Sequence, residues 1–66
     1  MNHKQLSLAA LRVNKNMTQQ DAADILGISR EQVGKVESGK DVKPVYIYAF
    51  AQLYGVETDI VRIEGE

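Results

Sequence analysis

Hydrophobic positions recur along most of the chain at the three- and four-residue spacing of an α-helix rather than at the alternating spacing of a strand. Glycines, a single proline and short polar stretches interrupt this pattern and set the boundaries. We expect helices near residues 3–14, 19–26, 30–37 and 44–54. After Gly55, the positions of Val56, Ile60 and Val61 fit a short fifth helix, but residues 61–63 fit an extended strand equally well.

Two of the predicted helix starts carry the pattern of a capping box, in which two side chains three positions apart satisfy the free backbone N–H groups. Thr18 with Asp21 opens the second helix, where the Asp21 carboxylate also favours the positive end of the helix dipole. Ser29 with Gln32 opens the third helix in the same way. Both helices therefore have well-defined beginnings in the sequence.

The first and fourth helices have weaker but similar signals. Asn2 followed by Gln5 predicts the start of the first helix. Pro44 suits the first position of the fourth helix, because proline lacks the N–H that would be unpaired there. Gly55 predicts the end of the fourth helix.

The second and third helices are joined by only Gly27, Ile28 and Ser29. A three-residue turn with glycine between two short capped helices is the signature of a helix-turn-helix, which we place at 18–38. This spacing is more specific than any single residue in it.

The third helix divides into two faces when its residues are projected at about 100° each. Its packing face carries Val33, Val36 and Glu37. Its opposite face carries Arg30, Glu31, Gly34 and Lys35. We expect Arg30, Glu31 and Lys35 to contact DNA bases, because Arg and Lys donate to guanine, Glu accepts from cytosine, and Gly34 lets the backbone approach a groove.

Further polar residues surround this face and suit contacts to DNA phosphates. We expect them at Gln19, Gln32, Ser38, Lys40 and Lys43. Exposed backbone amides at helix N-termini favour anions in the same region.

The residues just described resemble the Cro and phage-repressor (XRE-like) helix-turn-helix family. The resemblance rests on Thr18–Arg30 (TQQDAADILGISR) and Val33–Lys40 (VGKVESGK), and it covers about residues 6–61. It implies an all-α fold, a compact five-helix domain like that of lambda repressor, which is usually dimeric and acts on transcription. The resemblance also implies that Gln19 holds a phosphate and that Arg12 pairs with Glu37.

Composition bounds the protein to a single domain, 1–66, because 66 residues leave room for only one core. The chain has no Cys, no long apolar run and no signal-peptide pattern, so we expect a cytoplasmic protein. The resemblance implies that a bacterium or phage encodes it. The net charge is −1 and the pI about 5.7, which is unusual for a DNA-binding protein. A short acidic tail at about 62–66 contributes to this balance, and we expect weak non-specific binding with strong salt dependence.

The fourth helix is apolar on nearly every side, so more than one of its faces must be covered. The small bundle could wrap it, with the tyrosine hydroxyls reaching water. We favour a homodimer instead, because one core of this size cannot surround the helix. The residues expected at the dimer interface are Tyr46, Phe50, Tyr54, Ile60 and Ile63.

These features predict a sequence-specific DNA-binding transcriptional regulator, a Cro-like repressor that binds a palindromic operator as a dimer. The alternative is a protein-binding module of the same fold, of the antitoxin or antirepressor type, for which the aromatic fourth helix is the best evidence. We expect no enzymatic activity, cofactor, metal or small-molecule ligand, because His3 is the only histidine and no phosphate-binding loop or carboxylate pair is evident.

Overall fold

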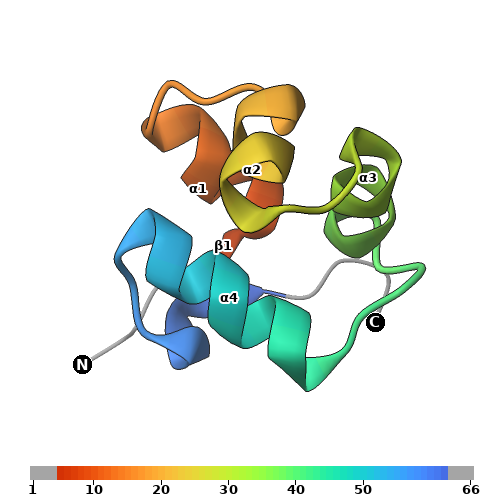
Figure 1. Cartoon of the computed structure of the whole chain (residues 1–66). Coiled ribbons are helices and arrows are strands. Elements are labelled where there is room, and N and C mark those ends of the chain that lie inside the picture. Colours follow the sequence, from red (N-terminus) through yellow and green to blue (C-terminus); the bar gives the residue numbers. More distant parts are fainter. Residues whose placement is uncertain (1–4, 63–66) are drawn as a thin grey trace.

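A computed structural model describes residues 5–62, and Figure 1 shows how the elements of this range are arranged. In chain order they are β1 (Leu6–Ser7), α1 (Leu8–Asn14), α2 (Gln19–Leu26), α3 (Arg30–Glu37), α4 (Pro44–Tyr54), the 3-10 helix η1 (Thr58–Ile60) and β2 (Val61–Arg62). The chain is therefore mostly helical, as predicted, and α2, α3 and α4 have their predicted bounds. Within the described range, no helix is long and apolar enough to cross a membrane.

Local capping explains why the bounds of α2 and α3 agree with those predicted from the sequence. The Thr18 hydroxyl accepts the backbone N–H of Asp21 at 3.0 Å, and the Asp21 carboxylate accepts the N–H of Thr18 at 2.9 Å. Gly27 ends α2 in the left-handed conformation with φ 74°, which costs glycine no steric strain. Ser29 then accepts the N–H of Gln32 at 3.0 Å and opens α3.

The N-terminal segment differs from the prediction of a helix over 3–14. Helix α1 begins at Leu8, where the Ser7 hydroxyl accepts the N–H of Ala10 at 3.1 Å. Leu6 and Ser7 form β1 because their backbone pairs with β2. The predicted capping residue Asn2 lies outside the described residues.

The C-terminal segment resolves the ambiguity that the sequence left after Gly55. Thr58–Ile60 form a single 3-10 turn, and Val61–Arg62 form β2, which runs parallel to β1 with Leu6 opposite Val61. Among the described residues there are thus four α-helices, and the predicted fifth one is replaced by a 3-10 turn and a strand. This difference arises from tertiary structure, because β2 is a strand only through its pairing with β1.

One hydrophobic core joins the four helices and β2. Its buried residues are Leu8, Leu11, Ala22, Ala23, Val33, Val36, Phe50, Ala51, Tyr54 and Val61. They come from every α-helix, so that α3 is fixed along one face and leaves its other face outward (Figure 1).

The structure corrects the predicted dimer surface at Phe50 and Tyr54. Their exposed fractions are 0% and 2%, and their rings lie 6.0 Å apart between centroids, so both belong to the core of one chain. The outward side of α4 instead exposes Val45 and Tyr48, at 66% and 60%. The single core thus covers much of the apolar helix, as the alternative interpretation of the sequence required.

Three other residues were predicted at the same surface. Tyr46 is partly buried and packs against the core, and Ile60 is also partly buried. Ile63 lies outside the described residues. The dimer itself stays a prediction.

Candidate nucleic-acid interface

Helix α3 presents a polar face outward from a firmly packed base. Val33 and Val36 are buried, with exposed fractions of 0% and 2%, which matches their predicted packing side. Arg30, Glu31 and Lys35 are all exposed on the other side. The structure therefore brings the three predicted base-contacting residues together on one accessible surface.

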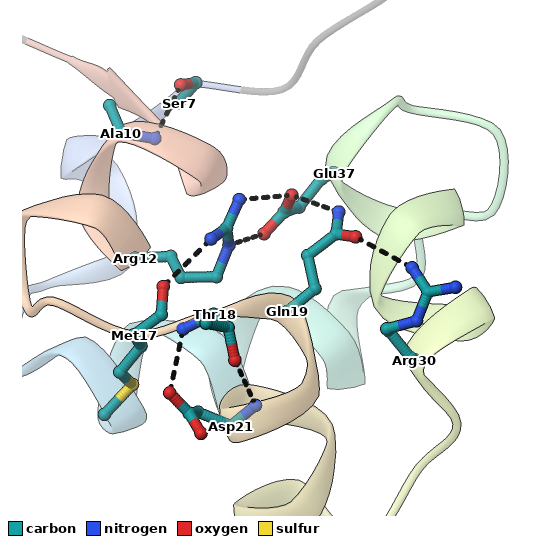
Figure 2. Close-up of polar contacts among 9 residues, drawn as sticks. All are labelled: Ser7, Ala10, Arg12, Met17, Thr18, Gln19, Asp21, Arg30 and Glu37. Atoms are coloured by element: carbon teal, nitrogen blue, oxygen red, sulfur yellow. Dashed lines mark hydrogen bonds and ion pairs between the residues drawn. The ribbon is translucent and has the colours of Figure 1, made fainter.

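An ion pair between the partly buried Arg12 and the buried Glu37 ties the end of α3 to α1 (Figure 2). Arg12 Nε donates to Glu37 Oε2 at 2.8 Å, and its Nη2 donates to Glu37 Oε1 at 3.4 Å. Arg12 Nη1 also donates to the carbonyl of Met17 at 2.9 Å. The hydrogen bond that Arg12 donates to Glu37, together with the negative charge of that carboxylate, raises the pKa of Arg12, whose guanidinium stays protonated. The predicted pairing of Arg12 with Glu37 is confirmed.

Gln19 extends this network from Glu37 to the outward face of α3 (Figure 2). Its Nε2 donates to Glu37 Oε1 at 3.0 Å, while its Oε1 accepts from Arg30 Nη1 at 3.5 Å. The amide is therefore oriented with its nitrogen toward the buried carboxylate and its oxygen toward Arg30. This orientation leaves the predicted phosphate contact of Gln19 to its second amide hydrogen or to its backbone N–H at the start of α2.

Tyr54 lies beside this ion pair without joining it. Its hydroxyl is buried and has no hydrogen-bond partner among the described residues. Burial raises the pKa of Tyr54 to about 12, and the negative charge of Glu37 adds to the effect. The phenol is thus neutral at any physiological pH.

Gln32 departs from its predicted part in a reciprocal capping box. Ser29 accepts its backbone N–H as expected, but the Gln32 side chain turns to the following loop, where its Nε2 donates to Asp41 Oδ2 at 2.8 Å. A hydrogen bond to the charged carboxylate of Asp41 is stronger than the one that the Gln32 side chain would make with the backbone N–H of Ser29. No sequence signal links these two residues, so their contact could not be predicted.

The loop after α3 is held close to the end of that helix. The Lys35 carbonyl accepts the backbone N–H of Lys40 at 2.9 Å and that of Asp41 at 3.3 Å, and it also accepts the Ser38 hydroxyl at 3.1 Å. Ser38, Lys40 and Lys43 are exposed, so their side chains are accessible. Lys43 immediately precedes α4, whose start has no side-chain cap.

The described residues contain no pocket and no cluster of acidic or histidine side chains that could hold a metal ion. Four large apolar side chains are exposed among the described residues, namely Val13, Ile25, Val45 and Tyr48, and the last two lie together on α4. A helical projection centred on Phe50 and Tyr54 would have placed both on the opposite side of α4.

Two short capped helices, a glycine turn and an outward polar face on the second helix define a helix-turn-helix protein. A family model described as helix-turn-helix matches residues 8–61. Because this match covers most of the chain, the protein belongs to that helix-turn-helix family, the one of Cro and the phage repressors. Its class is that of DNA-binding transcriptional regulators. No curated protein and no solved structure matches the chain.

Proposed function

We propose that this protein is a Cro-like transcriptional repressor that binds a palindromic operator as a homodimer and places α3 in the major groove. The observation that carries the proposal is the outward face of α3, where Arg30, Glu31 and Lys35 are exposed on a helix held by the core. A rigid helix of this kind presents donors and an acceptor to base edges in a defined geometry.

The contacts divide by chemistry. Arg30 and Lys35 donate to guanine, and Glu31 accepts from cytosine or balances the charge of Lys35. The phosphate contacts are assigned to polar groups around this face, namely Gln19, Gln32, Ser38, Lys40 and Lys43. For Gln32 the proposal uses the amide hydrogen that is not directed at Asp41.

The dimer is proposed to form through the outward side of α4. Val45 and Tyr48 are one helical turn apart and strongly exposed, and α4 contains no charged side chain. In a twofold contact the same surface of both copies meets, so an uncharged surface brings no like charges together. The two α3 helices should then lie about 34 Å apart, one turn of DNA.

Selection of bound duplexes from a random library tests this function directly. The expected result is an enriched palindrome whose half-sites are about one helical turn, roughly 10 bp, apart. Affinity for this operator and for a scrambled duplex, measured at several salt concentrations, then separates specific from non-specific binding. Enrichment of no sequence, together with equal affinity for both duplexes, contradicts sequence-specific regulation.

Light scattering during size exclusion, at tens of micromolar protein, tests the dimer independently. Tyr48→Asp is expected to yield a monomer, because a carboxylate in an apolar contact would lose its water without gaining an ionic partner. Asp24→Ala, an exposed change on α2, serves as the control and should leave the dimer intact. A wild-type monomer that also binds DNA in single copies contradicts the proposal.

The exposed apolar side of α4 also favours a second candidate, a module that binds another protein, as an antitoxin or antirepressor does. Retention on heparin and on random DNA across a salt series distinguishes the two functions. A module that binds only protein shows no salt-dependent retention on either matrix.

A further inference from the structure

Gly34 lies in the middle of the outward face of α3, among the three residues proposed to contact bases. It follows Arg30 by four positions and Glu31 by three, so it shares their side of the helix, and Lys35 is the next residue along the chain. Glycine inside a helix is less favourable than alanine. A glycine at this position therefore calls for a reason.

The fold supplies no such reason. Gly34 is not among the glycines with positive φ, which are Gly27, Gly39 and Gly55, so its backbone conformation suits any residue. A Cβ built on Gly34 would meet only the Nε2 of Gln19, at 3.9 Å, which is an ordinary van der Waals contact. Alanine would fit here without displacing a neighbour, and it would strengthen α3.

We propose that Gly34 is a specificity-determining residue that leaves room for the 5-methyl group of a thymine in the operator. This inference rests on the proposed function, since it requires α3 to enter the major groove. The thymine methyl is the apolar group that base pairs present in that groove, and it projects from the base edge. The bare Cα of Gly34 is an apolar surface of matching size, set between the polar side chains of Arg30 and Lys35.

This arrangement gives each residue type on α3 a separate task. Arg30 and Lys35 donate to the acceptors of neighbouring guanines. Gly34 leaves room for the thymine methyl group, where a larger side chain would keep the helix away from the base. A single added methyl group at position 34 then acts on two levels. It stabilises the free protein, and it separates the helix from the thymine.

The experiment adds a methyl group to the protein and removes one from the DNA. Each thymine of the selected operator is replaced in turn by deoxyuridine, and the affinities of wild type and Gly34→Ala are measured for every duplex. On the unmodified operator Gly34→Ala should bind about tenfold more weakly, because the added methyl group overpacks a close contact. Its melting temperature should rise, which shows that the loss does not come from unfolding.

One thymine in each half-site should respond to the substitution. There, deoxyuridine should weaken wild-type binding about fourfold, the value of one buried methyl-sized group. The same replacement should strengthen binding by Gly34→Ala, because the DNA then has space for the added Cβ. Equal binding by Gly34→Ala and wild type, or a deoxyuridine effect that is the same for both proteins at every thymine, overturns the inference.

Arg30→Ala separates this inference from the proposed function. If Arg30→Ala loses its preference for the operator while Gly34→Ala behaves as wild type, α3 reads bases and only the part assigned to Gly34 is wrong. If wild type itself shows no preference for the operator over a scrambled duplex, the proposed function fails. The deoxyuridine scan of wild type alone tests the thymine contact even without the variant.

Discussion

Replacement of Arg12 by alanine should remove much of the stability of the folded chain. The guanidinium donates to both oxygens of Glu37 and to the Met17 carbonyl, and the Glu37 side chain is only 7% exposed. After the change, the described contacts of Glu37 reduce to the single hydrogen bond from Gln19 at 3.0 Å. Burying a carboxylate without its ionic partner costs about 3–5 kcal/mol.

That cost is large against the total. Globular proteins have free energies of unfolding of about 0.05–0.15 kcal/mol per residue, or roughly 3–10 kcal/mol for a chain of this length. Arg12→Ala should therefore leave a large fraction of the chains unfolded at room temperature if the total lies near the lower bound. Urea denaturation followed by helical circular dichroism measures the difference, provided that the slope of the transition stays unchanged.

Two controls define what the ion pair contributes. Arg30→Ala removes an exposed arginine and should change the free energy of unfolding by no more than about 0.5 kcal/mol. The double variant Arg12→Met with Glu37→Leu removes both charges and should recover most of the loss, because apolar groups can replace a buried pair. Since Gln19 also loses its acceptor in that variant, some loss should persist. An Arg12→Ala protein that unfolds at the wild-type urea concentration refutes the reasoning, because the pair would then have to be solvated.

Two further predictions concern the core and the proposed DNA contacts. Tyr54→Phe should raise the melting temperature by about 4–8 °C, because it removes a buried hydroxyl that has no partner and costs about 1 kcal/mol. The pKa of Tyr54 is about 12 in the folded chain and about 10 in the unfolded chain, so ionisation favours the unfolded chain and the free energy of unfolding should fall between pH 10 and 12. Urea denaturation over this range should show wild type losing stability relative to Tyr54→Phe, and parallel curves would contradict the assignment. On DNA, Arg30→Ala and Lys35→Ala should weaken operator binding far more than scrambled-duplex binding, whereas Lys40→Ala should weaken both alike and lower the salt slope by about 1. If Arg30→Ala lost the same affinity for both duplexes, Arg30 would not contact a base.

The helix boundaries at Thr18, Gly27 and Gly55 could be predicted because the interactions that set them are local. A cap joins residues three positions apart, and a glycine ends a helix because it can adopt a positive φ by itself. Both signals therefore act in the same way in any tertiary context. The helix-turn-helix followed from these signals together, and the pairing of Arg12 with Glu37 followed from the family resemblance. The outward positions of Arg30 and Lys35 followed from the helical period once Val33 was placed inside.

The features that could not be predicted depend on contacts between distant parts of the chain. Leu6 pairs with Val61, which lies near the other end of the sequence. Because of this pairing, the start of the predicted first helix and the end of the predicted fifth helix are strands instead. Neither segment is a strand in isolation, because two residues with so few backbone hydrogen bonds have no stability of their own. Similarly, the bond from Gln32 to Asp41 depends on how the loop folds back on α3.

Helix α4 shows the same division within one element. Its pattern indicated a helix and required cover on more than one side, but an almost uniformly apolar sequence has no period that says which side faces the core. Packing against the other helices selected Phe50 and Tyr54 for the interior and left Val45 and Tyr48 outside. The choice belongs to the tertiary structure, because hydrophobic burial depends on the surface removed from water and has no directional preference along the chain.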